Sequence, residues 1–394
     1  MDKLSTLVLA LDIANGSDLA AVALADRRIR VWKLTSGEVL HEFSFPSPET
    51  DEHLKVAGEV EPISVRFSPD GKYLAISFLS QIHLYDVFTW DEKASLGVPG
   101  EDQPRSDLKI TPQRPQLERR SAEQAQADKD KPILSLNDSI KAWAEATERG
   151  DGRTRITSFA FTMDGSSIIA AYCRGKCLAS TWLRLETFPT GSDPVRLWNI
   201  ASARFVWEHV YDENTAVEKI VTSPDGNRFA SVQARPGRCA VGMHDINDGR
   251  TLWLHSSGPC ADPPSIQFST DGQSFITNRI EQGNQKNKLW RNTATYESRS
   301  GKMVSDFSGR DSVRDADISS DGCWLASTTW SGLRFQIWDV SSKKPVRIET
   351  PKEWKWRGPP INRVRFSPDG RWLVVGNDQI GNLVIYQFGP SWHN

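Results

Sequence analysis

The segment 63–78 reads ISVRFSPDGKYLAISF, and the segment 362–377 reads NRVRFSPDGRWLVVGN. Both contain the hexapeptide RFSPDG, at residues 66–71 and 365–370. Its last four residues fit a type I turn, because Pro supplies a φ near about −65° at the second position and Gly suits the exit. Short segments of alternating apolar and polar residues lie on both sides. The pattern predicts two antiparallel strands joined by a tight turn.

This turn recurs along the chain, which indicates a repeat architecture. Turns of this kind are expected at seven places: residues 14–17, 68–71, 162–165, 223–226, 269–272, 319–322 and 367–370. A third strand is expected after each turn, ending in an aromatic residue or a histidine: Trp32, Tyr85, Trp198, His244, Tyr296, Trp338 and Tyr386. A fourth strand is expected in six of the seven units, and the seventh unit is short.

These repeats resemble those of the WD-repeat family of β-propellers, and Trp338-Asp339 is a literal Trp-Asp pair. The resemblance implies an all-β fold, a seven-bladed propeller around a central channel, with one long insertion between blades 2 and 3. A single propeller is expected over residues 1–394, with blades at 5–45, 61–96, 155–211, 216–256, 263–308, 312–350 and 360–394. The insertion at 97–154 is polar, and we expect it to be partly disordered with a short amphipathic helix near 138–149.

The repeats depart from the family pattern in two ways. No unit has the Gly-His dipeptide, so we expect the buried hydrogen-bond network that the family builds from Asp, His, Ser and Trp to be incomplete. The blade cores then depend more on apolar packing. In the seventh unit, either the blade has three strands and leaves an edge exposed, or the chain is a fragment of a longer protein.

Composition argues against several classes of protein. The 48 basic and 50 acidic side chains give a net charge of −2, so there is no electrostatic reason to expect nucleic acid as the main partner. No apolar stretch approaches the roughly 20 residues of a membrane span. The five cysteines, an odd number, are expected to be reduced intracellular thiols. We therefore expect the protein in the cytoplasm, with the nucleus as the alternative.

Sequence motifs of catalysis and of metal or cofactor binding are absent. The chain has no phosphate-binding loop, no His-Glu-x-x-His pair and no Gly-x-Ser-x-Gly element. Cys173 and Cys177 offer two metal ligands, but no second cysteine or histidine pair completes a site. His244 stands at the aromatic position of its repeat, where a packing role fits better than catalysis. No catalytic, metal or cofactor site is predicted.

The lengths of the expected loops favour one face of the propeller as the functional face. The links between blades and the links between second and third strands share one face, here called the top face, and they contain nearly all the surplus chain. Tryptophan is enriched among residues that dominate interface energies. The predicted partner-contact residues in these links are Trp354, Trp356, Arg357, Trp330, Trp182 and Trp143. The alternative is that these tryptophans hold the long loops onto the disc.

The favoured function is a non-catalytic scaffold that binds a partner protein or peptide through the top face, within a multiprotein complex. Two alternatives stay open. An enzyme that uses the central channel would need convergent ionisable side chains with perturbed pKa values. A propeller associated with RNA or the ribosome would use Arg and Trp contacts and show salt-dependent affinity. No cofactor and no membrane partner is expected.

Overall fold

The computed structural model describes residues 8–24, 28–45, 64–78, 80–97, 111–113, 154–174, 194–211, 215–235, 238–258, 265–282, 289–307, 313–329, 335–346, 361–377 and 383–387. Within these residues the chain forms strands and no helix. No helix long and apolar enough to cross a membrane is therefore found in this part of the chain. The predicted helix near 138–149 lies outside the described residues.

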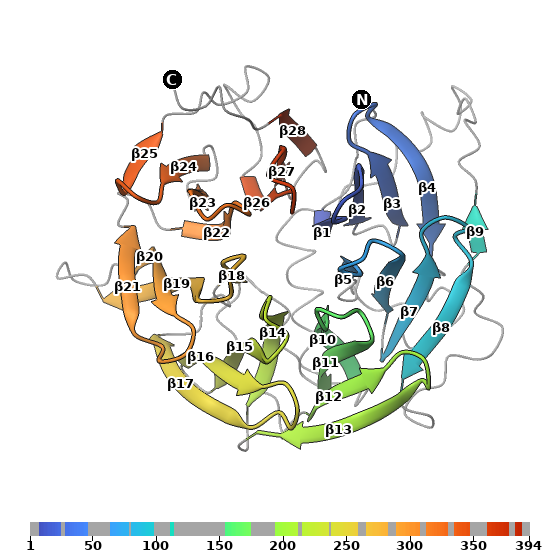
Figure 1. Ribbon diagram of the computed structural model, residues 1–394, viewed down its shortest axis with the longest axis horizontal. Coiled ribbons are helices and arrows are strands. Elements are labelled where there is room, and N and C mark those ends of the chain that lie inside the picture. The colour runs from blue at the N-terminus through green and yellow to red at the C-terminus, as the bar shows by residue number, and fades with distance from the viewer. Residues whose placement is uncertain are drawn as a thin grey trace, which may run out of the picture.

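The strands form seven antiparallel sheets arranged in a ring (Figure 1). Blade 1 contains β1 (Val8–Ile13), β2 (Leu19–Leu24), β3 (Arg28–Lys33) and β4 (Glu38–Ser44). Blade 2 contains β5 (Ser64–Phe67), β6 (Tyr73–Phe78), β7 (Gln81–Asp86) and β8 (Glu92–Gly97). Blade 3 contains β10 (Thr154–Phe161), β11 (Ser167–Arg174), β12 (Pro194–Asn199) and β13 (Arg204–Val210).

The remaining blades continue around the same ring. Blade 4 contains β14 (Ala216–Thr222), β15 (Arg228–Arg235), β16 (Arg238–Asp245) and β17 (Thr251–Gly258). Blade 5 contains β18 (Ile266–Phe268), β19 (Ser274–Gln282), β20 (Leu289–Glu297) and β21 (Met303–Phe307). Blade 6 contains β22 (Val313–Ile318), β23 (Trp324–Thr329), β24 (Phe335–Asp339) and β25 (Lys344–Val346). Blade 7 contains β26 (Ile361–Phe366), β27 (Trp372–Asn377) and β28 (Leu383–Gln387). The prediction of an all-β, seven-bladed propeller is confirmed.

The repeated Ser-Pro-Asp-Gly segment forms the turn between the first and second strands of a blade. In blade 2, Ser68 Oγ donates to Asp70 Oδ1 at 2.6 Å and accepts from the backbone N–H of Tyr73 at 2.9 Å. The Gly71 N–H donates to the Ser68 carbonyl at 2.9 Å, and Gly71 has a φ of 69°, which glycine adopts without strain. Each of these bonds is local, so residues 68–73 are enough to specify the turn.

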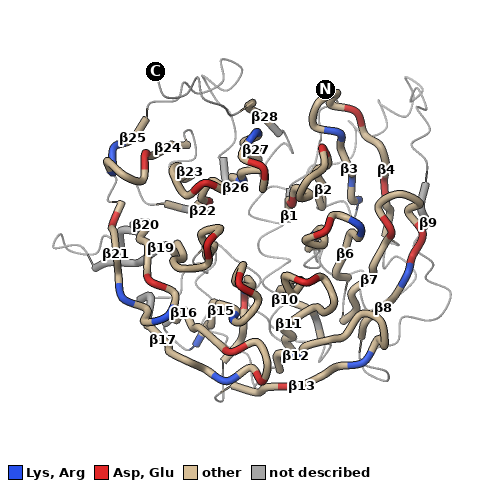
Figure 2. The backbone as a smooth tube through the Cα atoms, viewed as in Figure 1, with Lys and Arg blue, Asp and Glu red and all other residues tan. Residues whose placement is uncertain are grey.

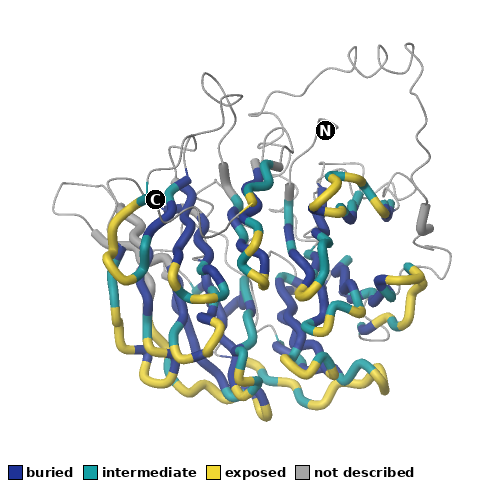
Figure 3. The backbone as a smooth tube through the Cα atoms, turned by 45° about the horizontal axis from the view of Figure 1, so that its top comes forward, coloured by how far each residue is buried: buried dark blue, intermediate teal, exposed yellow. Residues whose placement is uncertain are grey.

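Apolar packing between neighbouring blades forms the core. The second strand of a blade is buried on both faces, as in β15, whereas the outer strand β13 is mostly exposed. Phe43 of blade 1 packs against Tyr85 of blade 2 with a ring separation of 4.6 Å. Figure 3 shows this distribution, with buried residues concentrated in the inner strands and exposed residues along turns and outer strands.

Polar contacts at the aromatic position of the repeat are present in some blades. In blade 6, Trp338 Nε1 donates to Ser327 Oγ at 3.2 Å. In blade 4, His244 Nε2 lies 2.7 Å from Ser231 Oγ, and Nδ1 lies 3.1 Å from the hydroxyl of Tyr211. Burial lowers the pKa of His244 to about 3, so its imidazole is neutral at pH 7. His244 therefore packs and accepts or donates hydrogen bonds as an uncharged ring.

Two blades differ from the four-stranded pattern. Among the described residues blade 7 has the three strands β26, β27 and β28; residues 1–7 and 388–394 lie outside the described part of the chain, so the choice between a three-stranded blade and a fragment stays a prediction. Blade 1 gains a fifth strand, β9 (Thr111–Gln113), which pairs antiparallel with the outer strand β4 and aligns Phe43 with Pro112. A short stretch of the insertion after blade 2 thus returns to the rim of blade 1, which the sequence did not predict.

The cysteines correct one expectation. Cys173 at the end of β11 and Cys239 at the start of β16 are both fully buried, and each of them is part of a disulfide bond. The expectation of reduced thiols is wrong for these two residues, because spacing along the chain does not show which sulfur atoms meet in space. Cys323 is an exposed free thiol, and partial burial raises its pKa.

Alkylation distinguishes the two kinds of cysteine. Under native conditions without reductant, iodoacetamide should modify Cys323. Cys173 and Cys239 should react only after denaturation and reduction. Peptide mass spectrometry with and without reductant measures this. Modification of Cys173 or Cys239 in denaturant alone would contradict the disulfide assignment.

Candidate functional site

The predicted partner-contact residues are not in the part of the chain that the structure describes. All six lie outside the described residues: Trp143, Trp182, Trp330, Trp354, Trp356 and Arg357. Their role in partner binding stays a prediction. The described residues instead bring together a group of charged side chains on the inner strands, which we treat as the candidate site.

The candidate site follows from one repeated position, two residues before the turn that ends each inner strand. From blade 1 to blade 7 this position is occupied by Asp12, Arg66, Ala160, Val221, Gln267, Asp317 and Arg365. Blade 7 lies next to blade 1 in the ring (Figure 1). Acidic and basic side chains therefore alternate over four successive blades, 6, 7, 1 and 2, and this position is uncharged in the other three.

Each carboxylate at this position bonds to the next blade. Asp12 Oδ2 accepts from the backbone N–H of Phe67 at 2.7 Å, which joins blade 1 to blade 2. Asp317 Oδ2 accepts from the backbone N–H of Phe366 at 2.7 Å, which joins blade 6 to blade 7. The two bonds are equivalent by repeat position. These carboxylates therefore hold neighbouring inner strands in register.

A second layer of polar residues lies two positions earlier on the inner strands. Asp315 there bonds to three groups: its Oδ2 accepts from Arg365 Nη1 at 2.7 Å and from the Val364 N–H at 3.2 Å, and its Oδ1 accepts from Ser265 Oγ at 2.7 Å. One side chain thus connects blades 5, 6 and 7. The Asp315 side chain is 2% exposed, against 20% for Arg365, so the guanidinium is the partner nearer to water.

The pKa values of the two blade 6 carboxylates are shifted in opposite directions. Burial would raise the pKa of Asp315, but the cations Arg365, Lys219 and Arg363 outweigh it, so this pKa lies well below its usual value. Burial raises the pKa of Asp317 to about 6, and the charge of Arg365 offsets only part of that effect. Asp315 is therefore ionised at neutral pH, whereas Asp317 exchanges its proton near pH 6.

This group has the convergence and the perturbed pKa values that the enzyme alternative requires. The three aspartates, however, each accept a hydrogen bond from the backbone of the next blade. Among the described residues, no group of three or more His, Cys, Asp or Glu side chains could hold a metal ion. The observed role of these carboxylates is to join blades.

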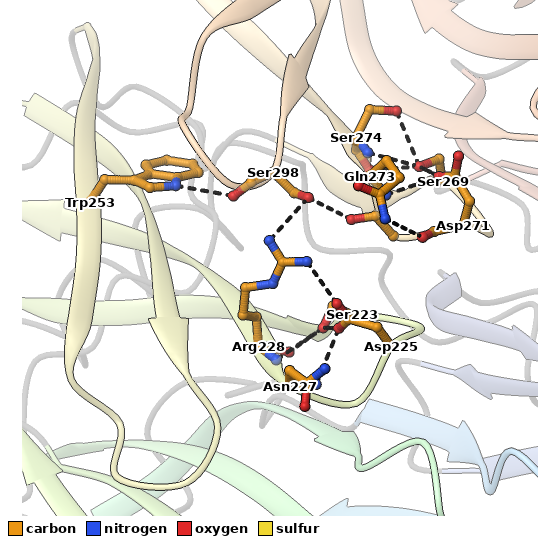
Figure 4. A network of polar contacts seen from close by, with 11 residues as sticks. Ser223, Asp225, Asn227, Arg228, Trp253, Ser269, Asp271, Gln273, Ser274 and Ser298 are labelled. Carbon is orange, nitrogen blue, oxygen red and sulfur yellow. Dashed lines mark hydrogen bonds and ion pairs between the residues drawn. The ribbon is translucent and has the colours of Figure 1, made fainter.

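A polar network on the turn side joins blades 4 and 5 in another way (Figure 4). Arg228 forms an ion pair with Asp225 at 2.7 Å and reaches Ser298 Oγ of the next blade at 3.4 Å. Trp253 Nε1 donates to the Ser298 carbonyl at 3.1 Å. Burial opposes ionisation of Asp225, but bonds from Ser223 and Arg228 lower its pKa to about 2. This network is structural, since its members are bonded to one another.

The rim of blades 3 to 5 has an apolar surface that sequence reasoning missed. Seven large apolar side chains are exposed on the three consecutive outer strands β13, β17 and β21: Phe205, Val206, Val210, Leu252, Leu254, Met303 and Val304. We call this set the rim belt. Single exposed apolar residues are ordinary, but several on adjacent strands are typical of contact surfaces. Charged residues of both signs are spread along the described chain, including its outer strands (Figure 2).

Comparison with known proteins supports the repeat assignment. The family described as WD domain, G-beta repeat, matches residues 301–339 and 352–380. Eukaryotic translation initiation factor 3 subunit I of Coccidioides immitis (strain RS) is 24% identical over 201 residues, which are 47% of this chain and 54% of that protein. The match thus spans about half the length of that relative.

A solved structure has the same arrangement over nearly the whole chain. Kuenenia stuttgartiensis hydrazine synthase matches with a TM-score of 0.64, covering 99% of this chain and 97% of that chain. The sequence identity is 12%. At this identity the likeness concerns the fold alone.

Proposed function

Because the chain is a WD-repeat β-propeller, we propose that it is a non-catalytic scaffold that binds a partner protein within a multiprotein complex. The observation that carries the proposal is the use of Asp12, Asp315 and Asp317, which join blade 1 to blade 2 and blade 6 to blade 7 by accepting the backbone N–H groups of Phe67, Val364 and Phe366. A ring held this way is a rigid platform. A rigid platform presents loops and strand edges to a partner with little loss of conformational entropy on binding.

We place the partner contact on the top face, at Trp354, Trp356 and Arg357. Two indoles and a guanidinium within four residues supply the aromatic and arginine side chains that dominate interface energies. Trp330, Trp182 and Trp143 belong to other links assigned to the same face. The rim belt is the competing contact surface, and the experiment below separates the two.

Affinity purification with the Trp354→Ala, Trp356→Ala double variant tests the proposed contact. The double variant should lose specific partners while its far-ultraviolet circular dichroism and melting temperature stay near those of the wild type. A matched variant of the rim belt, Val206→Asn with Val304→Asn, should keep them. Loss in the rim variant alone would move the contact to the rim belt. Loss in neither variant would reject both surfaces.

The similarity to subunit I of translation initiation factor 3 favours a second, more specific candidate, a subunit of a translation-initiation complex in the cytoplasm. It rests on 24% identity over about half of that relative. Sedimentation of cell lysate tests it, since such a subunit should move with initiation complexes. If ribonuclease treatment or moderate salt releases the protein while partner proteins stay assembled, direct RNA association is the better explanation.

A further inference from the structure

The outer edge of blade 1 is a place where this propeller accepts an added strand. β9 pairs antiparallel with the last three residues of β4, in the pairs Glu42–Gln113, Phe43–Pro112 and Ser44–Thr111. In the part of the chain that the structure describes, the other blades have three or four strands and blade 1 has five. Figure 1 shows β9 at the rim of the ring, beside β4. The backbone of β4 is therefore able to pair with a strand that lies outside its own blade.

Contacts with blade 2 hold β4 in place. The ring of Phe43 is fully buried and lies 4.6 Å from the ring of Tyr85, which belongs to blade 2. His41 is also buried and stacks on Trp90 of blade 2 with a ring separation of 4.8 Å. These two side chains fix the strand from one side. An incoming strand therefore meets an ordered edge, and little entropy is lost in ordering β4 when the strand binds.

β9 is a weak occupant of this edge. It has three residues, whereas β4 has seven, and Pro112 at its centre has no N–H. Bonded and non-bonded pairs alternate along an antiparallel ladder, so Pro112 fits opposite Phe43 as a non-bonded pair. Thr111 and Gln113 are then the residues of β9 whose N–H groups can donate to β4. Pairing also closes the chain on both sides of β9 within the insertion at 97–154, which costs conformational entropy.

The charges on β4 select which side chain can lie opposite them. Glu42 Oε2 accepts from Arg30 Nε at 2.5 Å and lies 3.9 Å from Arg28 Nη1, and both arginines belong to the neighbouring strand β3. Side chains directly opposite each other on paired strands interact, and like charges there are destabilising. The residue opposite Glu42 in an added strand should therefore not be acidic. β9 meets this condition, because it places the neutral Gln113 there.

We propose that the outer edge of blade 1 binds an extended segment of a partner protein, which pairs antiparallel with β4 in place of β9. The segment has a β-branched residue opposite Phe43 and a neutral or basic residue opposite Glu42, and main-chain hydrogen bonds supply most of its affinity. β9 competes with it from within the same chain, where its effective concentration is high. This edge is separate from the top-face contact, so failure of either proposal leaves the other intact.

Fluorescence anisotropy with a labelled peptide and the full-length protein tests the proposal. The peptide covers residues 107–114 and carries Pro112→Val, so that it offers β4 a strand without proline. It should bind the Gln113→Pro protein about tenfold more tightly than wild type, because this substitution removes one of the two donors of the internal competitor. Pro112→Val in the protein should weaken peptide binding, since it strengthens β9. Gln116→Pro, which lies in the insertion but outside β9, is the matched control and should bind the peptide as wild type does.

Hydrogen exchange measured by mass spectrometry locates the bound peptide. Saturating peptide should slow amide exchange in residues 38–45 of the Gln113→Pro protein, because backbone groups of β4 then pair with the peptide. A control peptide with proline at positions 111 and 113 should neither bind nor protect, since it has no N–H groups for β4. Equal affinity of the peptide for wild type and Gln113→Pro, binding of the control peptide, or protection of another outer strand in place of β4 would overturn the proposal.

Discussion

Replacement of Asp315 by asparagine is expected to lower the free energy of unfolding by about 3–5 kcal/mol, because it breaks a buried ion pair and leaves one partner charged. Asp315 is 2% exposed and binds Arg365 at 2.7 Å. The variant keeps an oxygen that can accept the Val364 N–H, so the loss comes from the unpaired guanidinium. Equilibrium unfolding in urea measures the change, provided that the slope with urea concentration stays the same.

A second substitution separates the charge effect from a general defect. Asp315→Asn combined with Arg365→Met should recover part of the lost stability, since the cation that Asp315 binds directly is removed with it. Glu208→Gln is the matched control on the rim, where Arg196 and Glu208 approach to 2.5 Å with Glu208 38% exposed. That change should cost less than about 1 kcal/mol. An Asp315→Asn protein within 1 kcal/mol of wild type would reject the assigned role.

The difference in stability between wild type and Asp315→Asn should depend on pH in one direction. The cations lower the pKa of Asp315 in the folded state below its usual value of 3.8. The contribution of its charge is therefore fully present above about pH 4 and is lost as the pH falls through the folded-state pKa. Wild type and Asp315→Asn should accordingly converge in stability under acidic conditions.

The turns of this fold could be predicted from sequence because their bonds are local. Ser68 bonds to Asp70 and Tyr73, so the turn is specified within its own segment. Its seven repetitions indicated a repeat architecture, and the resemblance to the WD-repeat family implied the ring. The repeat position at which Asp and Arg alternate could also have been found in the sequence. An alignment of the seven units on their turns shows this position. The alternation of charge is continuous only because blade 7 lies beside blade 1 in the ring.

Other features could not be predicted from the sequence because they join residues that are distant along the chain. Asp12 and Phe67 are 55 positions apart, and no periodic pattern connects them. The strand β9 has three residues, too few for an alternating pattern, and its pairing with β4 depends on the path of the insertion. The rim belt went unrecognised because outer strands alternate apolar with polar residues whether or not a partner covers them.

Replacement of Asp317 by asparagine is expected to raise the free energy of unfolding at pH 7.5 by about 1–3 kcal/mol. Burial raises the pKa of Asp317 from 3.8 to about 6, so the folded protein retains a proton that the unfolded chain releases. Wild type therefore loses stability as the pH rises from about 4 to about 6, by at most about 3 kcal/mol for a shift of this size. Asparagine avoids this loss, and its Oδ1 can still accept the Phe366 N–H.

Urea unfolding of both proteins at pH 4 and pH 7.5 decides whether the sign is right. The gain of Asp317→Asn should be present at pH 7.5 and nearly absent at pH 4, where wild-type Asp317 is largely protonated. Asp271→Asn is the opposite control, because bonds from Ser269 and the Gln273 N–H lower the pKa of this exposed turn aspartate. It should be destabilising at pH 7.5. If Asp317→Asn is instead less stable than wild type at pH 7.5, attraction to Arg365 outweighs the cost of burying the Asp317 charge, and Arg365 pairs with both blade 6 carboxylates.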